Sequence, residues 1–379
     1  MLYLDHAATT PVRPEVLQAM LPYLTDRFGN PSSHHTVGEA AATALADARA
    51  RVAAVLGFRP ADIVFTSGGT EADNLAVKGL AIGAAAQRGA PVHIVTTPIE
   101  HEAVLASCDY LERVHGFVVT RLPVDATGTV RPDDLAAAIR PDTAVVSIGY
   151  ANNEIGTVQD AATLAAVTSA ARVPLHLDAV QAAGWLPLAG TGADALSLAG
   201  HKIGAPQGIG VLAVRARLPL EPVLHGGGQE RDRRSGTENL AGAVGLATAL
   251  ELAEAERAEA SARVGALRDA FVARVLALVP NARLTGHPTR RLPGTASFTF
   301  AGTSGEAVLL ELERRGVVTS SGSACAAGSD EPSHVLIACG IDPETARTAV
   351  RFTLPHTHTA DLSGVADAVA SAVAAVRST

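Results

Sequence analysis

Short apolar runs rich in β-branched residues alternate with alanine-rich helical windows along the first two thirds of the chain. Parallel strands need a crossover segment between them, usually a helix, so this alternation predicts an α/β fold with a parallel sheet covered by helices. The predicted helical windows include Val37 to Leu56, Ala72 to Gln87 and Gln159 to Ala171. The seven predicted strands are Asp62 to Thr66, Val92 to Thr96, Phe117 to Leu122, Ala144 to Tyr150, Pro174 to Asp178, Asp194 to Leu198 and Gly208 to Val214.

A second, smaller domain is predicted from a change of pattern beyond Thr237. From there to about Val279 an Ala/Leu/Glu/Arg pattern indicates long helices, and the remaining chain returns to mixed strands and helices. We place the large domain at residues 15–255 and the small domain at residues 1–14 together with 256–379. No low-complexity linker or charge block separates them, so the two domains are expected to pack closely.

The composition excludes several classes of protein. With 379 residues, 47% of them apolar, the chain is long enough to bury a large core. A formal charge of −8 argues against nucleic-acid binding as its main function, and the basic cluster Arg231, Arg233 and Arg234 therefore needs another explanation. No apolar stretch reaches the roughly 18 residues of a membrane span, and the N-terminus lacks a secretory pattern, so we expect a cytoplasmic protein with no membrane contact.

The three cysteines are too few and too scattered for a disulfide framework or a zinc site. Cys108 and Cys339 lie in apolar, helix-like contexts and are expected to be small buried side chains. Cys325 lies instead among glycine, serine and alanine, in a segment that predicts an exposed and mobile loop. Only Cys325 is therefore expected to have a reachable thiol.

Lys202 is one of only two lysines among thirty basic residues, the other being Lys78. An arginine cannot form an imine with an aldehyde, so an amine retained at this position indicates chemistry that needs one. Asp178 ends a predicted strand one strand-and-turn earlier. A lysine and a carboxylate so placed suggest pyridoxal phosphate, which needs a Schiff-base lysine and an acidic partner for its ring nitrogen. A surface amine and a strand-end cap remain the alternative for this pair alone.

Two further segments fit a phosphate-bearing ligand. The run Thr66 to Ala72 follows a predicted strand and opens a helix, where backbone N–H groups and the Thr70 hydroxyl can hold a phosphate, although an ordinary turn has the same pattern. Asn152 and Asn153 follow the strand that ends at Tyr150, at the sheet edge where open α/β sheets bind ligands. A turn is the alternative, and we expect it for one of the two asparagines.

The chain resembles the cysteine desulfurases of the class V aminotransferase-like family, in the branch that supplies sulfur for iron–sulfur clusters and thio-modification. The resemblance rests on ten strings in the same order along the whole chain. They are YLDHAATTP at Tyr3, FGNPSS at Phe28, FTSGGTEADNLAVKG at Phe65, EHEAVL at Glu100, NNEIGTVQD at Asn152, HLDAVQ at His176, GHKIGAPQGIG at Gly200, HGGGQERDRRSGTEN at His225, SSGSACAAGSDEPS at Ser320 and VRFTL at Val350.

The resemblance implies fold type I of the pyridoxal-phosphate-dependent transferases, with a mainly parallel seven-stranded sheet in the large domain and a smaller α/β domain. It also implies the residues that bind pyridoxal 5'-phosphate. Lys202 would carry the Schiff base, Asp178 would pair with the ring nitrogen, and His101 would stack on the ring and transfer protons. The remaining cofactor ligands would be Gln181 and Asn153 near the ring oxygen, and Gly69, Thr70 and His201 at the phosphate.

The same resemblance assigns the substrate, the nucleophile and the assembly. Arg351 would bind the carboxylate of L-cysteine together with Asn153, although a structural ion pair is the alternative role for this arginine. Cys325 would attack the substrate sulfur, keep it as a persulfide and release L-alanine. Thr237, after Arg234 and Ser235, would reach the phosphate of the other subunit, which implies a homodimer and explains the basic cluster.

The lysine motif departs from its relatives at Ala199, where they usually have a serine that binds the phosphate. The loss of one charge-assisted hydrogen bond, worth about 1.5–3 kcal/mol, would weaken cofactor retention. An aminotransferase or lyase of this fold would have no use for Cys325, and a catalytically silent scaffold would be expected to have lost Lys202, Arg351 or Cys325.

Several functions within the family remain open. A sulfur-acceptor protein such as an iron–sulfur scaffold is the expected partner. Selenocysteine as substrate, and DNA or tRNA sulfuration as destination, stay open as alternatives.

Overall fold

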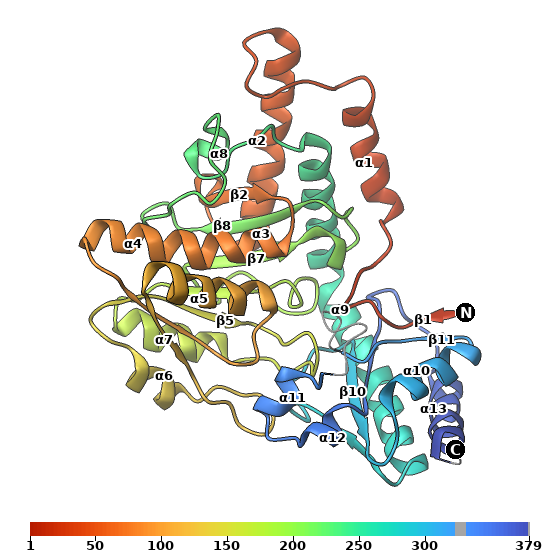
Figure 1. Cartoon of the computed structure of the whole chain (residues 1–379). Helices are drawn as coiled ribbons and strands as arrows, with labels where there is room; N and C mark the ends of the chain where they lie inside the picture. Colours follow the sequence, from red (N-terminus) through yellow and green to blue (C-terminus); the bar gives the residue numbers. More distant parts are fainter. Residues whose placement is uncertain (323–330, 378–379) are drawn as a thin grey trace.

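The computed structural model describes residues 1–322 and 331–377. Its largest element is a seven-stranded sheet with the strand order β2-β8-β7-β6-β5-β3-β4, in which only β8 runs antiparallel to its neighbours (Figure 1). The predicted mainly parallel sheet is confirmed, and each predicted strand lies within two residues of an observed one. The strands are β2 (Ile63–Thr66), β3 (His93–Thr96), β4 (Val118–Arg121), β5 (Thr143–Gly149), β6 (Leu175–Asp178), β7 (Ala195–Ala199) and β8 (Gly210–Val214).

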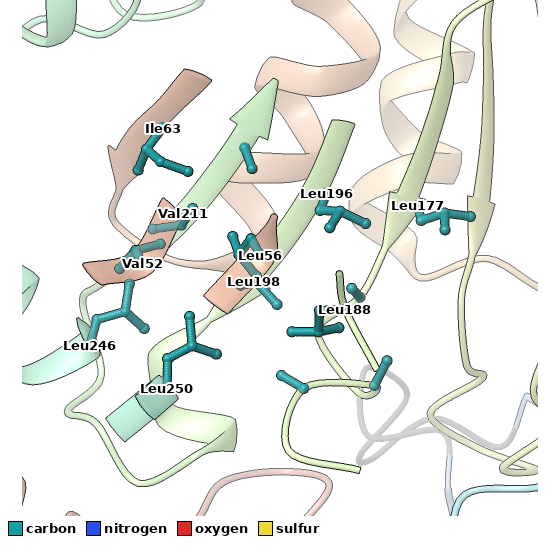
Figure 2. Close-up of a cluster of buried hydrophobic side chains, with 14 of the residues drawn as sticks. Val52, Leu56, Ile63, Leu177, Leu188, Leu196, Leu198, Val211, Leu246 and Leu250 are labelled. Atoms are coloured by element: carbon teal, nitrogen blue, oxygen red, sulfur yellow. The ribbon is translucent and has the colours of Figure 1, made fainter. Parts of the chain in front are cut away.

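Helices cover both faces of this sheet, because successive strand residues are apolar on both sides. On one face lie α3 (Gly69–Asn74), α4 (Leu80–Arg88) and α5 (Glu102–His115). On the other lie α1 (Pro14–Leu24), α2 (Thr36–Leu56), α6 (Pro132–Ala138), α7 (Ala161–Ala170) and the start of α9. Figure 2 shows the core beneath this second layer, where Leu56 and Leu250 face Leu198.

The predicted helix Ala72 to Gln87 is interrupted. A π-helical turn, η2 (Leu75–Gly79), joins α3 to α4. Such a turn widens the helix locally and changes the direction of the side chains that follow it. In Figure 1 α3 and α4 lie end to end across the sheet, and α3 contacts β7 and β8 while α4 contacts β5.

The smaller part of the molecule is built on an antiparallel sheet with the order β12-β10-β9, made of β12 (Ala349–Thr353), β10 (Thr295–Phe300) and β9 (Ala282–Leu284). Its core includes Phe271, Phe298 and Phe352, whose rings contact one another edge to face. The helices and strands around it are α10 (Gly305–Arg314), α11 (His334–Ala338), α12 (Pro343–Ala346), α13 (Ser363–Arg377), and β1 (Leu2–Tyr3) paired with β11 (Val317–Val318).

The long helices predicted beyond Thr237 are a single helix, α9 (Leu240–Leu278), of 39 residues. Its first half packs in the core of the large sheet and its second half, with Val264 and Phe271, packs in the small core. The N-terminal segment also joins the small core through Leu4. The proposed boundary at residue 255 falls inside α9 and stays a prediction.

Cys108 and Cys339 are both buried, as predicted. The remaining short elements are the helix α8 (Gln229–Asp232) and two 3₁₀ turns, η1 (Pro60–Asp62) and η3 (Gly200–Lys202). Within residues 1–322 and 331–377, no helix combines the length and the apolar composition needed to cross a membrane.

Candidate active site

A cavity of about 790 Å³ opens at the carboxyl ends of β5, β6 and β7, where the large sheet meets the small part of the molecule. This is where an open α/β sheet is expected to bind its ligand. Nine of the eleven predicted site residues line it, although they come from distant parts of the chain. They are Gly69, Thr70, His101, Asn153, Asp178, Gln181, His201, Lys202 and Arg351.

The other two predicted residues do not line this cavity. Thr237 is exposed and lies on the segment between α8 and α9. Cys325 lies outside the described residues. Gly322, the last described residue before it, accepts a hydrogen bond at its carbonyl oxygen from Arg351 Nη1, and Glu331, the first after it, lines the cavity. Both described ends of the segment that holds Cys325 thus meet at the cavity.

Lys202 ends the short turn η3 that follows β7. Its Nζ donates hydrogen bonds to the carbonyl oxygens of Ala7 and Ala8, the latter at 2.8 Å. Gln181 donates to the same Ala7 oxygen at 3.0 Å. The N-terminal segment therefore forms one wall of the cavity and orients both side chains.

Asp178 is the last residue of β6 and faces the cavity half-buried. Burial raises its pKa, while the Val180 N–H at 3.0 Å and the nearby His101 and Lys202 oppose that rise. The carboxylate therefore has a backbone donor in contact and the Lys202 amine and His101 ring nearby. Such a group can stabilise a positive charge placed in the cavity.

His101 is the N-cap of α5, and its Nδ1 accepts a hydrogen bond from the Ala103 N–H at 3.0 Å. The neutral ring consequently carries its proton on Nε2. The neighbouring wall holds His201, whose Nδ1 lies 3.2 Å from the Thr9 hydroxyl. Burial and the adjacent Lys202 lower the pKa of His201 to about 4, so this ring is neutral at pH 7.

Gly69 begins α3 directly after the β2 strand and its turn, as the sequence predicted. A Cβ at this position would lie 2.8 Å from Val180 Cγ2 and 3.4 Å from Ala199 Cβ. A side chain would thus fill the space through which the helix start reaches the cavity. Ala199 lines the same wall with a methyl group, where a serine would offer a hydroxyl.

Only one of the two asparagines is available to a ligand, as expected. Asn152 Oδ1 accepts from the N–H groups of Glu154 and Ile155, which makes it a turn residue. Asn153 lines the cavity, and its backbone oxygen accepts from Arg351 at 2.7 Å.

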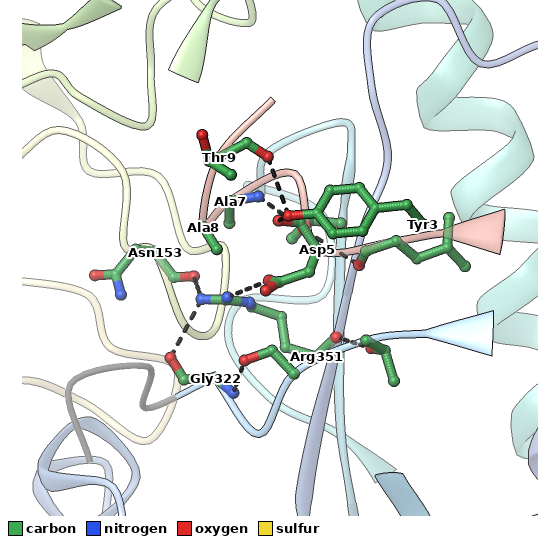
Figure 3. Close-up of polar contacts among 12 residues, drawn as sticks. Tyr3, Asp5, Ala7, Ala8, Thr9, Asn153, Gly322 and Arg351 are labelled. Atoms are coloured by element: carbon green, nitrogen blue, oxygen red, sulfur yellow. Dashed lines mark hydrogen bonds and ion pairs between the residues drawn. The ribbon is translucent and has the colours of Figure 1, made fainter. Parts of the chain in front are cut away.

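Arg351 is 1% exposed and forms the ion pair that was considered as its alternative role, while its role in substrate binding stays a prediction. Its Nη2 pairs with Asp5 at 2.8 Å, and its Nη1 donates to Asn153 and Gly322 (Figure 3). Its buried Nε has no hydrogen-bond partner among the described residues. The guanidinium is therefore fixed by an ion pair, and its Nε is a donor that no described residue uses.

The sequence interpretation missed the acidic residues that line the cavity beside Asp178, and the two most buried of these are Asp73 and Glu100. Asp73 is three residues beyond Thr70 on α3, and Glu100 directly precedes His101. Asp73 could have been found because residues three apart on a helix lie on the same face, and Glu100 because it is next to His101 in the sequence.

Comparisons with known proteins give a consistent result. The aminotransferase class-V family model matches residues 2–361. A cysteine desulfurase IscS from Methanosarcina thermophila is 46% identical over 362 residues, which are 95% of this chain and 88% of that protein. A solved structure described as a NifS-like protein superposes with a TM-score of 0.88 at 34% identity and covers 100% of this chain and 98% of its own. A structure of SspA in complex with cysteine superposes with a TM-score of 0.81 at 36% identity. The match covers 94% of this chain and 99% of that one.

The buried thiols should be unreactive in the native protein. Burial raises the pKa of Cys108 to about 12 and that of Cys339 to about 11, and only the thiolate reacts with alkylating reagents. We expect iodoacetamide at pH 7 to leave both unmodified in the folded protein and to modify both after denaturation. Peptide mass spectrometry measures this, and rapid native labelling of either residue would contradict it.

Proposed function

This chain belongs to the aminotransferase class-V family and to its cysteine desulfurases, and from that membership we propose that it removes sulfur from L-cysteine with pyridoxal 5'-phosphate and releases L-alanine. The observation that carries the proposal is the convergence of Lys202, Asp178, His101 and Arg351 on one cavity. An amine, a carboxylate, an imidazole and a guanidinium are the groups that this reaction needs.

The residues of the cavity fit the cofactor. Asp178 faces the cavity beside two cationic or potentially cationic groups, which suits a carboxylate that pairs with a protonated ring nitrogen. The glycine at position 69 leaves room at the helix start for the phosphate, with Thr70 and His201 beside it. When bound, pyridoxal phosphate supplies an electron-withdrawing ring that stabilises negative charge on the α-carbon of the substrate.

The cavity side chains would each have a separate role in binding the cofactor and the substrate and in transferring protons. Lys202 Nζ would hold the cofactor covalently and carry the proton taken from the α-carbon of the substrate. His101, held with its proton on Nε2, would stack on the ring and exchange protons above it. Gln181 and Asn153 would orient the ring oxygen and the substrate.

Arg351 would bind the carboxylate of L-cysteine. Its Nε is a donor without a partner in the described structure, and Asp5 keeps the guanidinium plane fixed. A pre-oriented guanidinium loses little side-chain entropy when the carboxylate binds. The ion pair to Asp5 therefore supports the role in substrate binding and does not compete with it.

Cys325 would accept the sulfur. Its thiolate would attack the sulfur of the substrate, so that an S–S bond forms as the substrate C–S bond breaks. The electron pair goes to the former β-carbon, which takes up a proton and becomes the methyl group of L-alanine. The sulfur stays on Cys325 as a persulfide for transfer to an acceptor.

The assignment of Lys202 is tested with a matched pair of variants, because the chain has only one other lysine. Lys202→Ala should lose the visible absorption of bound cofactor and all turnover of L-cysteine. Lys78→Ala should keep both, since Lys78 bonds Asn74 at 2.6 Å and lies outside the cavity. Absorption spectra and alanine release measure the outcome, and an active, coloured Lys202→Ala protein would remove the basis of the proposal.

Sulfur transfer is tested separately from cofactor binding. Cys325→Ser should keep the cofactor absorption and respond spectrally to L-cysteine, yet form no persulfide and release essentially no alanine, because a serine hydroxyl is not ionised at neutral pH. Cys108→Ser and Cys339→Ser are the controls and should keep turnover. Mass spectrometry locates the persulfide, and its presence on Cys108 or Cys339 would assign the reaction to another thiol.

We also propose a two-fold dimer in which Thr237 serves the partner's site. An apolar stripe on the outer face of α1 and just beyond it supports this, since Leu17, Leu21, Leu24 and Phe28 are 50%, 47%, 59% and 68% exposed. The inner face of α1 packs on α9. A helix that is apolar on both faces is normally covered on both.

The basic cluster fits this assembly better than a nucleic-acid surface. Arg234 pairs with Glu71 at 2.8 Å, and Arg231 donates to the carbonyl oxygen of Ile63. These side chains hold the segment before Thr237 against the large domain.

A mixing experiment tests the shared site. Thr237→Ala alone should weaken cofactor binding, and Lys202→Ala alone should be inactive. A mixed dimer would contain one site with both native residues, so mixing the two variants at limiting cofactor should raise activity above either alone. Light scattering should give the mass of a dimer. A monomer with full cofactor and activity would contradict the proposal.

For the destination of the sulfur we propose a class of acceptor and not an individual protein. An acceptor protein for iron–sulfur cluster assembly or thio-modification is the proposed partner, with selenocysteine as an alternative substrate and DNA or tRNA sulfuration as alternative destinations. We propose a cytoplasmic reaction because a thiol that must be free to attack needs a reducing compartment.

A further inference from the structure

Three carboxyl groups meet at the inner wall of the cavity. Asp73 on α3 is 2% exposed, Glu100 before α5 is 3% exposed, and Asp178 ends β6. All three line the cavity, and burial, with the nearby Asp178 adding to it, raises the pKa of both Asp73 and Glu100. Three negative charges this close in a buried site would repel strongly, so their ionisation states must differ.

Asp73 faces a polar patch on the sheet that contains no cation. Ser147, His176 and Ser197 lie on adjacent strands, with His176 Nδ1 2.9 Å from the Ser147 hydroxyl and Nε2 2.8 Å from that of Ser197. Burial lowers the pKa of His176 to about 3, so the ring is neutral at pH 7. Asp73 Oδ1 lies 3.7 Å from Nε2 and has no hydrogen-bond partner within the described part of the chain.

Burial together with Asp178 therefore raises the pKa of Asp73 well above its usual range, and the Ser197 hydroxyl only partly opposes this. An ionised Asp73 would lack both a counter-charge and a full set of donors. The neutral carboxyl avoids that cost.

Glu100 lies on the other side of Asp178. The register of the sheet places Gly149 beside Asp178, and a Cβ on Gly149 would come within 3.1 Å of Glu100 Oε2. Glu100 Oε1 lies 2.6 Å from the Thr97 hydroxyl. Burial raises the pKa of Glu100 to about 8, with a further rise from Asp178 and opposing hydrogen bonds from Thr97 and Gly149.

Asp178 differs from its two neighbours in its counter-charges. Lys202 and His101 both lower its pKa, and the Val180 N–H donates to it. Of the three carboxyls it is thus the one that ionises most readily.

We propose that Asp73 and Glu100 are uncharged carboxylic acids that act as positioning residues, leaving Asp178 as the single carboxylate of the cluster. The inference deepens the proposed function and rests on it in one respect, since Asp178 is the group assigned to the cofactor nitrogen. One negative charge then faces one positive ring nitrogen. Neither neighbour adds a second charge that would overstabilise the protonated ring or raise the pKa of Asp178 further.

The first experiment makes the same chemical change at each of the three positions. Asp73→Asn and Glu100→Gln replace an uncharged acid by an uncharged amide of the same shape, so cofactor affinity and the pH profile of cofactor absorption should stay within a few-fold of wild type. Asp178→Asn removes the carboxylate and should weaken cofactor binding by tenfold or more. A pH profile displaced in Asp73→Asn or Glu100→Gln would show that the residue is ionised and overturn the proposal.

The second experiment needs no cofactor and so separates this inference from the proposed function. A carboxyl that is protonated when folded and has a pKa near 4 when unfolded releases a proton on unfolding, so stability falls as pH rises between those pKa values. Between about pH 7 and 8, where buried histidines such as His176 and His201 are neutral in both the folded and the unfolded state, the unfolding constant of the apo-protein in urea should rise with pH, by about tenfold per pH unit for each such proton. Asp73→Asn and Glu100→Gln should each reduce the slope by one proton.

Infrared spectroscopy of the wild-type apo-protein gives a direct reading that does not depend on a variant folding. Protonated carboxyls have a carbonyl stretch distinct from the bands of carboxylates. At pH 7 we expect such a signal, reduced in each of the two amide variants. Its absence in wild type, or slopes that both variants leave unchanged, would show that Asp73 and Glu100 are ionised.

Discussion

The pairing of β5, β6 and β7 in parallel register is the constraint on which the site depends. It sets Gly149, Asp178 and Ser197 side by side at the same sheet edge. Since successive residues of a strand face opposite sides, a slip of one residue would turn Asp178 into the apolar layer beneath α2 and α9. The apolar neighbours Leu177 and Leu196 prevent such a slip, because they fill that layer (Figure 2).

The N-terminal segment is the second element that holds the site together. Leu4 packs in the small core, Asp5 pairs with Arg351, and the Ala7 carbonyl accepts from Lys202. A turn at residues 5–8 thus connects the guanidinium of Arg351 on the small sheet to the amine of Lys202 beyond β7, and Figure 3 shows the Asp5 end of this turn against Arg351. The relative position of these two groups is set by covalent geometry as much as by packing between the two cores.

The sequence predicted the large sheet well and the polar cluster poorly, for a physical reason. Buried parallel strands are short apolar runs between turns, so a local pattern locates Ile63–Thr66 or Leu175–Asp178 closely. Asp73 and Glu100 stand close in sequence to Thr70 and His101, but their burial beside Asp178 depends on how α3 packs on β7 and α5 on α3, which the sequence pattern does not contain. The single helix α9 was missed as one unit because propensity does not show which core each turn enters.

The motifs shared with the cysteine desulfurases predicted which residues would line the cavity. The spacing of residues in the sequence did not decide this by itself. Lys202 with Asp178 suggested a cofactor, but for that pair alone a surface amine with a strand-end cap was the stronger interpretation; in the structure both residues line the cavity. For Arg351 the two interpretations do not exclude each other. It forms an ion pair with Asp5, and its Nε has no hydrogen-bond partner among the described residues.

The helix α9 has a consequence for dissecting the protein. At about 1.5 Å per residue its 39 residues span nearly 60 Å, and each half supplies one wall of a different core. A fragment that ends near residue 255 would leave an apolar helix face uncovered on both products. Neither sheet could then be isolated as an autonomous folding unit. A chimaera that exchanges one of the two cores between relatives would have to keep α9 intact, from Leu240 to Leu278.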